Sequence, residues 1–185
     1  EKLGTTLSKA RAEASDPFAE AVADELQGLG IGDGEFRVEV GKRELGPSGR
    51  DSVAFLVRPN PGLPFAPAAE TASGGELSRI ALALRAVAHA SAGEPTVVFD
   101  EIDAGIGGQT AHAVADALRR LGERAQILTI THLPQIASAA EAHLRVEKVP
   151  GDPTHTRIAR LSEEERREEL ERMLGGAEFL STFRR

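Results

Sequence analysis

The 185-residue chain is 41% hydrophobic and 28% charged, a composition typical of a soluble globular protein with one main core. It contains no Cys, which excludes disulfides, thiolate metal sites and cysteine nucleophiles and fits a reducing cytosol. The net charge of −7 excludes an evenly basic DNA-binding surface, so any DNA contact needs a local patch or another part of a larger protein. We expect such a larger protein because the chain begins at Glu1, and no stretch is apolar enough to span a membrane.

Residues 1–29 are predicted to be helical. Apolar residues repeat at helical spacing in two stripes, the first formed by Leu3, Leu7, Ala10 and Ala14 and the second by Phe18, Val22, Leu26 and Leu29. Ser15-Asp-Pro17 between them predicts a break and a restart, with Asp16 as N-cap. The pattern fits two amphipathic helices on a core, or the end of a longer coiled coil.

Residues 30–70 are predicted to begin with a glycine-rich turn and to form an antiparallel pair of strands. Apolar residues alternate with charged ones over 36–40 and over 53–57, and a polar turn over Gly41 to Arg50 joins them. The proline-rich segment from Arg58 to Pro67 is predicted to be an irregular loop.

A glycine turn running into a helix follows at Thr71-Ala-Ser-Gly-Gly-Glu-Leu-Ser-Arg79. Ser73 and Glu76 have the spacing of a capping box, and the apolar face of the helix is predicted to contain Leu77, Ile80, Ala81, Leu84, Val87 and Ala88. Such a start leaves free backbone N–H groups at the positive end of the helix dipole, where a phosphate can bind. An ordinary well-capped helix has the same local sequence. Gly93-Glu-Pro95 is predicted to end it.

Two short apolar runs, Thr96 to Phe99 and Ile127 to Ile130, are predicted to be parallel strands buried on both faces. A helix over Gln109 to Leu121 connects them, which gives a βαβ unit. Because parallel strands end at the same sheet edge, Asp100, Glu101 and His132 are expected to lie together there.

The rest of the chain is predicted to add a short helix and an antiparallel pair. The helix lies near Gln135 to Ala139, and the strands are Leu144 to Val149 and Thr156 to Leu161. Ser162-Glu-Glu-Glu165 is a second capping box that opens a charged helix, which Gly175-Gly176 ends. A short last helix is predicted over Ala177 to Phe183.

An apolar strand ending in Asp-Glu is a Walker B arrangement. In such a site Asp100 holds the Mg²⁺ shell, Glu101 orients or deprotonates the attacking water, and His132 reaches the γ-phosphate. Each residue also has an ordinary explanation, since acidic pairs at strand ends are common, a lone His is more often structural, and Asp103 can cap a turn. The order of all these motifs along one chain favours the catalytic interpretation.

This order resembles the C-terminal half of an ABC-type ATPase head. Ser73 to Glu76 resemble the ABC signature, Asp100 and Glu101 the Walker B motif, Asp103 with Ala104 and Gly105 the D-loop, and His132 the H-loop. The resemblance implies an α/β fold, the C-terminal lobe of an ABC/SMC-type head. Its mainly parallel sheet would be flanked by helices, with an antiparallel strand pair and a helical coiled-coil stub.

The amino-acid sequences of three segments resemble, more specifically, the RecN family of bacterial SMC-like proteins of DNA double-strand-break repair. These segments are Ala72 to Arg79, Phe99 to Gly108 and Thr131 to Ala137, preceded by Asn60-Pro-Gly62. The family implies ATP-dependent DNA repair and recombination, ATP and Mg²⁺ as ligands, and a location in the bacterial cytoplasm at the nucleoid.

One departure from the pattern concerns the P-loop. The chain contains no Gly-x-x-x-x-Gly-Lys-Ser/Thr, so that the phosphate-binding Lys of Walker A is missing. The resemblance then divides the chain into a stub that ends a coiled coil (1–29) and a C-terminal head segment (30–185). This segment is expected to be inactive alone and to need the N-terminal half of the head.

The family pattern also implies a second head. Ser73, Gly74 and Gly75 would act on a nucleotide bound by the partner head, and Asp100, Glu101 and His132 on the nucleotide of their own head. The resemblance also counts Glu76 and Asp103 among the nucleotide-binding residues. DNA would bind to the full-length protein. The alternatives are a head segment of another SMC-like or ABC ATPase, or a non-catalytic interaction module of the same fold.

Overall fold

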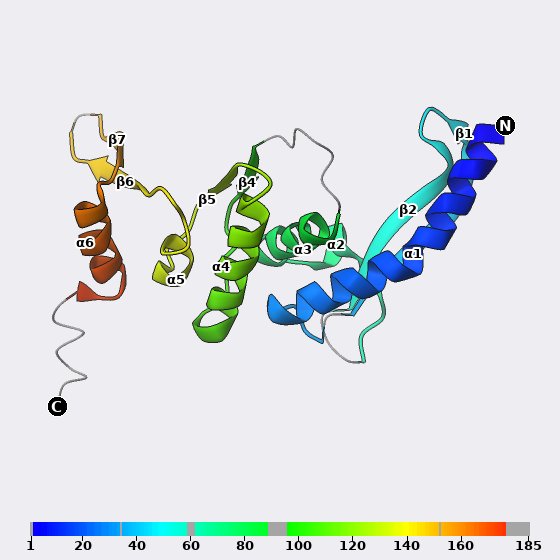
Figure 1. Cartoon of the computed structure of the whole chain (residues 1–185), viewed down its shortest axis with the longest axis horizontal. Helices are drawn as coiled ribbons and strands as arrows, with labels where there is room; N and C mark the ends of the chain where they lie inside the picture. The colour runs from blue at the N-terminus through cyan, green and yellow to red at the C-terminus, as the bar shows by residue number, and fades with distance from the viewer. Residues whose placement is uncertain (1, 34, 59–61, 89–95, 152, 177–185) are drawn as a thin grey trace. The chain divides into compact units, whose positions relative to one another are not determined.

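The computed structural model describes residues 2–33, 35–58, 62–88, 96–151 and 153–176 (Figure 1). The predicted helix end at Gly93-Glu-Pro95, Asn60 and Pro61 of the family motif, and the last predicted helix over 177–183 lie outside these residues. The chain forms two compact units, residues 1–130 and 131–185, and each is described by itself. The predicted boundary at residue 29 stays a prediction.

The first unit contains four helices and five strands among its described residues. Its helices are α1 (Lys2–Gly28), α2 (Ala68–Thr71), α3 (Gly74–Val87) and α4 (Gly108–Gly122), and its strands are β1 (Glu35–Gly46), β2 (Gly49–Arg58), β3 (Ala66–Pro67), β4 (Val97–Phe99) and β5 (Ile127–Thr129). The predicted strand pair and the βαβ unit are thereby confirmed. The core combines residues of α1, the first sheet, α3, β4 and α4, among them Val22, Leu26, Phe36, Val57, Ile80, Leu82, Phe99, Ile102, Val114 and Leu121.

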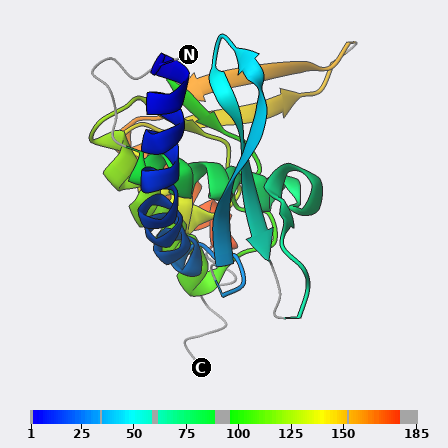
Figure 2. The same cartoon turned by 90° about the vertical axis from the view of Figure 1, so that its right-hand side faces the viewer.

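Helix α1 is one continuous helix, and the predicted break at Ser15-Asp-Pro17 is wrong. Pro17 lies inside the helix, and the Ser15 hydroxyl donates 2.7 Å to the carbonyl oxygen of Arg11, one turn earlier. A proline in a helix interior removes one backbone hydrogen bond and costs about 3 kcal/mol. Packing against the β1–β2 pair along the helix offsets this cost, as the parallel course of α1 and the pair shows in Figures 1 and 2.

The two stripes of α1 have different environments. Val22, Leu26 and Leu29 of the second stripe are buried as predicted, whereas Leu3 of the first stripe is 87% exposed and Ala10 and Ala14 are also exposed. In this half of α1 the polar residues Ser8 and Arg11 face the strands, and the Leu7 side chain lies close to Gly49. The exposed first stripe does not fit the interpretation of two amphipathic helices on a core, and the alternative, the end of a longer coiled coil, stays a prediction.

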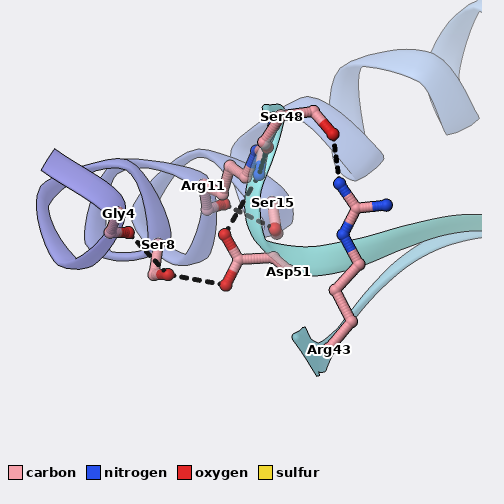
Figure 3. A network of polar contacts seen from close by, with 7 residues as sticks. All are labelled: Gly4, Ser8, Arg11, Ser15, Arg43, Ser48 and Asp51. Atoms are coloured by element: carbon pink, nitrogen blue, oxygen red, sulfur yellow. Dashed lines mark hydrogen bonds and ion pairs between the residues drawn. The ribbon is translucent and has the colours of Figure 1, made fainter. Parts of the chain in front are cut away.

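A hydrogen-bonded network joins this end of α1 to the β1–β2 pair (Figure 3). The Asp51 carboxylate, 7% exposed, accepts from the Ser8 hydroxyl at 2.6 Å and from the Arg11 guanidinium at 3.1 Å, and Arg11 also donates to the Ser48 carbonyl oxygen at 3.0 Å. The Ser8 hydrogen bond and the Arg11 charge lower the pKa of Asp51. These contacts fix α1 to the turn between β1 and β2.

Strands β1 and β2 pair over most of their length, with Val38 opposite Phe55 and Val40 opposite Val53. Their apolar face is buried near Val57 and becomes exposed toward the turn, where Val53 is 46% exposed. The strands continue beyond a register shift at Lys42, so the turn is shorter than the predicted Gly41–Arg50. Ala66 and Pro67 pair with β2, which corrects the prediction that this segment is irregular throughout.

The second unit contains α5 (Pro134–Ala137), the antiparallel strands β6 (Leu144–Val149) and β7 (His155–Arg160), and α6 (Glu163–Met173). All four elements agree with the predictions within one or two residues. Glu169 of α6 is 5% exposed and accepts from Arg172 at 2.6 and 2.9 Å. This charge-assisted pair lowers the pKa of Glu169, while burial lowers that of the neighbouring His143.

Candidate nucleotide-contacting site

The start of α3 has the predicted capping box. The backbone N–H and the hydroxyl of Ser73 each donate to the Glu76 carboxylate at 2.8 Å, and the Glu76 N–H donates to the Ser73 oxygen at 3.4 Å. These hydrogen bonds lower the pKa of Glu76, so its carboxylate is ionised at neutral pH. The box fixes the direction in which the chain enters the helix.

Gly74 and Gly75 are the first two residues of α3, and they serve different purposes. A Cβ atom on Gly75 would lie 2.8 Å from Ala104 Cβ and 2.9 Å from the carbonyl oxygen of Glu101, so that only glycine allows the loop to approach. A Cβ atom on Gly74 would meet only the end of the Glu101 side chain, at 2.9 Å. Gly74 and Ser73 are exposed, which leaves the start of the helix accessible to an anion.

The apolar face of α3 differs from the predicted one. Gly75, Arg79, Ile80, Leu82 and Ala83 are buried, whereas Ala81 and Ala88 are exposed. The helix is turned toward the loop that follows β4, because this loop packs against Gly75 and Arg79. The predicted face is confirmed at Ile80 and wrong at Ala81 and Ala88. Its remaining members, Leu77, Leu84 and Val87, are half-buried.

The loop after β4 brings the predicted acidic residues to the start of α3. Asp100 and Glu101 are both exposed, and Asp100 accepts a hydrogen bond from the Glu101 N–H at 2.9 Å. Glu101 has φ of +55°, and among the described residues no other non-glycine residue has a positive φ. Such strain is found where the surroundings over-determine the backbone, often at functional sites.

Asp103 is 4% exposed, unlike Asp100 and Glu101. Its carbonyl oxygen accepts from the Ile106 N–H at 3.3 Å, which closes a turn in the predicted D-loop. Its predicted contact with a nucleotide stays a prediction.

Two residues that contact this loop were not identified from the sequence. Ser78 donates to the carbonyl oxygen of Asp100 at 2.7 Å, and Arg79 donates to those of Ile102 and Ala104 at 3.1 and 3.0 Å. The helical spacing of Gly75, Ser78, Arg79 and Leu82 is the signal that could have indicated them, since it places two polar residues on the glycine side of the helix.

His132 is exposed and belongs to the second unit, whereas Asp100 and Glu101 belong to the first. Strand β5 runs parallel to β4, with Thr129 opposite Phe99, and Ile130 donates to the Phe99 carbonyl oxygen at 3.0 Å. The parallel order behind the prediction is thus confirmed. The position of His132 beside the two carboxylates stays a prediction.

The β4–β5 pair is buried on one face only, which corrects the prediction of strands buried on both faces. Phe99 is 3% exposed, whereas Val98, its register partner Leu128 and Ile130 are 56%, 46% and 57% exposed on the opposite face. Among the described residues of this unit, helices cover one side of the two strands. Exposed apolar side chains on both strands of a parallel pair indicate a surface that another element covers.

The donor set fits ATP and Mg²⁺ in part. The described residues include no group of three or more His, Asp or Glu side chains that could hold a metal ion. Asp100 is exposed at the sheet edge, and a Mg²⁺ site commonly uses one or two carboxylates together with waters and nucleotide phosphates. The described residues thus offer one exposed carboxylate and one helix start to such a site.

The sequence is similar to those of bacterial DNA repair proteins. DNA repair protein RecN of Streptomyces coelicolor is 42% identical over an alignment that covers 98% of this chain and 34% of the relative. The RecN proteins of Xylella fastidiosa and Vibrio cholerae are 42% and 39% identical over 92% and 93% of this chain. The chain matches a C-terminal portion of RecN. It spans about a third of the length of these RecN relatives.

Solved structures show the same fold. The Smc head domain with a coiled coil and joint from Pyrococcus yayanosii has a TM-score of 0.58 at 22% identity, covering 84% of this chain and 28% of that structure. A structure concerned with ATP-driven dimerization and DNA-stimulated activation of SMC ATPases has a TM-score of 0.55 at 17% identity, covering 90% of this chain and 96% of that one. The fold is thus that of an SMC head domain. No family model matches the chain.

A search of the described residues for membrane-spanning segments finds no helix with the length and apolar character needed to cross a bilayer.

Proposed function

We propose that this chain supplies the signature motif, Walker B residues, D-loop and H-loop of an ATP-driven head in DNA double-strand-break repair and recombination. The observation that carries the proposal is the packing of an exposed, glycine-led helix start against an Asp100-Glu101 loop within one unit. The names of the RecN relatives supply the biological process. Cytoplasmic, nucleoid-associated work on DNA is part of this proposal.

The start of α3 would contact a nucleotide held by a second head. Ser73, Gly74 and Gly75 would direct the free N–H groups of the first helical turn at a γ-phosphate, and Glu76 would hold Ser73 in place through the capping box. The helix dipole adds about half a positive charge at this end. ATP bound between two heads would thereby join them into a homodimer.

The loop after β4 would act on the nucleotide of its own head. Asp100 would hold Mg²⁺ through a water molecule, and Glu101 would orient or deprotonate the attacking water. Asp103 would contact the partner's nucleotide site through the D-loop, and His132 would donate to the γ-phosphate. ATP with Mg²⁺ supplies the phosphoryl group that is transferred to water.

The N-terminal half of the same head would cover the exposed face of the β4–β5 pair. Val98, Leu128 and Ile130 would then be buried, and the P-loop missing from this chain would reach the sheet edge. A mixture of the chain with this half should bury these residues, which hydrogen exchange over 97–99 and 127–130 would detect. The chain alone should hydrolyse no ATP. DNA would contact other parts of the full-length protein, because this segment carries a net charge of −7.

The test uses the full-length protein that contains this segment. Glu101→Gln should leave ATP binding intact, lower turnover by about 10²-fold or more and trap an ATP-bound dimer. The measurements are steady-state phosphate release and light scattering with ATP. Wild-type turnover in Glu101→Gln, or rapid dissociation of its dimer, would refute the hydrolytic role. A full-length protein that neither binds ATP nor dimerises would instead favour an interaction module of the same fold.

A further inference from the structure

Arg79 occupies an unusual position for a charged residue. It lies on the buried side of α3 and is 3% exposed. Arginine is rarely buried to this extent unless it is paired, and a guanidinium keeps its charge in proteins. Burial lowers the pKa of Arg79, and the charges of Glu76 and Asp103 oppose this effect. An apolar side chain would fill such a position at lower cost, so the retained charge calls for an explanation.

Arg79 donates to backbone carbonyl oxygens of the loop that follows β4. One nitrogen, Nη1, donates to Ile102 at 3.1 Å and to Ala104 at 3.0 Å. Ser78, the preceding residue, donates to Asp100 at 2.7 Å. Three alternate carbonyl groups of residues 100–104 therefore accept hydrogen bonds from two neighbouring side chains of α3. Carbonyl groups outside helices and strands need such partners when they are buried.

The same loop contains the strained residue. Glu101 lies between Asp100 and Ile102 and has φ of +55°, a conformation that persists only when neighbouring contacts hold it. Its carbonyl oxygen accepts from the Ala104 N–H at 2.9 Å and approaches Gly75, where a Cβ atom would lie at 2.9 Å. The side chains that hold the loop on both sides of Glu101 thus belong to α3, which we call the signature helix because it begins with Ser73 to Glu76.

One donor atom of Arg79, Nε, is buried and makes no hydrogen bond with the described residues. Buried donors without partners are rare in folded proteins, and they are found where a group serves a purpose besides stability. The hydrogen bonds that Arg79 makes among the described residues go to loop carbonyls through Nη1, which favours a positioning role.

We propose that Ser78 and Arg79 are positioning residues that fix the Asp100–Ala104 loop to the signature helix. The helix start that contacts the partner's nucleotide and the loop that acts on the head's own nucleotide would then move as one rigid piece. Contact of Ser73 with one ATP would set the position of Glu101 at the other. This proposal rests on the proposed function for its effect on turnover, and on the contacts alone for its effect on the loop.

The test compares Arg79→Met with Arg79→Lys and Ser78→Ala in the full-length protein. Arg119→Met serves as the matched control, because Arg119 is exposed on α4 and, within the described part of the chain, forms its ion pair with Asp116 one turn away. Arg79→Met should lower kcat by about 10- to 100-fold, because a loop displaced by about 1 Å loses catalytic geometry. Ser78→Ala and Arg79→Lys should give smaller losses, since each keeps part of the anchor.

Two further measurements separate positioning from folding. ATP affinity, and ATP-dependent dimerisation in a Glu101→Gln background, should stay within about twofold of the parent protein, an expectation for changes that leave the nucleotide contacts in place. Without nucleotide, hydrogen exchange at Ala104 and Ile106 should be faster in Arg79→Met and unchanged in Arg119→Met. A lower kcat at unchanged ATP affinity, together with faster exchange at Ala104 and Ile106, is not expected of a residue that only stabilises the fold.

Unchanged exchange over 100–106 in both Arg79→Met and Ser78→Ala would overturn the anchor, as would an unchanged kcat. A parallel loss of ATP binding, dimerisation and turnover in all three variants would reduce Arg79 to a folding residue and would also overturn it. Failure of the proposed function is recognised separately. In that case Glu101→Gln retains turnover, while the exchange measurement without nucleotide still tests the anchor.

Discussion

Helices α3 and α6 begin with the same capping chemistry but differ in the two residues that follow the cap. Ser73 and Ser162 each donate a backbone N–H to a Glu three residues later at 2.8 Å, and the Glu N–H groups return hydrogen bonds at 3.4 and 3.3 Å. In both helices these bonds lower the pKa of the Glu, which is Glu76 in α3 and Glu165 in α6.

The first turns differ in charge and in bulk. Helix α3 continues with Gly74 and Gly75, whereas α6 continues with Glu163 and Glu164. The acidic side chains of α6 already complement its dipole and repel a phosphate, whereas α3 leaves its positive end open. A capping box therefore shows where a helix begins, and the residues at its first two positions decide whether the start can serve an anion.

The largest expected effect comes from placing the same bulky charge at both caps. In the full-length protein Ser73→Arg should abolish ATP-dependent dimerisation and lower turnover by more than about 100-fold, as losses of transition-state contacts do. ATP binding should persist, because the partner's signature does not hold the head's own nucleotide. Ser162→Arg should change turnover by no more than about twofold, as is usual for surface positions. Phosphate release measures the turnover of the two variants, and nucleotide titration measures their ATP binding. Equal losses of turnover in Ser73→Arg and Ser162→Arg would contradict the proposed difference between α3 and α6.

The two glycines of α3 should differ from each other in their effect on stability. Gly75→Ala should destabilise the head by about 1–3 kcal/mol, because its Cβ would collide with the backbone of Glu101 and with Ala104. Gly74→Ala should cost less than about 1 kcal/mol, since only the end of the Glu101 side chain must move and alanine favours a helix. Thermal unfolding of the full-length variants measures the order. A larger loss for Gly74→Ala would contradict the close approach at Gly75.

Removing the two caps should give similar losses of stability. Ser73→Ala and Ser162→Ala each remove one side-chain acceptor and should cost about 1 kcal/mol. Turnover should fall only in Ser73→Ala, because only α3 is proposed to contact a nucleotide. Melting temperatures and phosphate release from the same preparations provide the check, and reduced turnover in Ser162→Ala with no change in melting would count against the distinction.

The smallest expected effect concerns pH. Because the folded state lowers the pKa of Glu76 below 4.5, its charge stabilises the folded state above that value, and this contribution is lost as the pH falls through the folded pKa. Glu76→Gln should therefore be less stable than the parent by a few tenths of a kcal/mol at pH 7 after solvent screening. The difference should shrink as the pH falls below 4.5 and should vanish once the carboxylate is protonated in the folded state. Melting curves between pH 3 and pH 7 test this, with Glu165→Gln as the matched variant at α6.

Local signals in the sequence were sufficient for the helix starts and most strands. Ser73 with Glu76 and Ser162 with Glu165 form capping boxes through contacts that span three residues, so the sequence specifies them directly. The alternation of apolar residues likewise placed β1 beside β2, and the short apolar runs placed β4 parallel to β5. The blocks from Ala72 to Arg79 and from Phe99 to Gly108 also carried the similarity to RecN.

Long-range packing decided the features that the sequence left open or indicated wrongly. Pro17 lies within a helix that packs against β1 and β2, and near the start of this helix Ser8 and Arg11 bind Asp51. Helix α3 is turned toward Arg79 because loop carbonyls 22 or more residues away accept its hydrogen bonds. Glu101 adopts its strained backbone for the same reason. Such contacts join residues far apart in the chain, and the periodicity within one element can indicate which face is in contact but does not identify the partner residues.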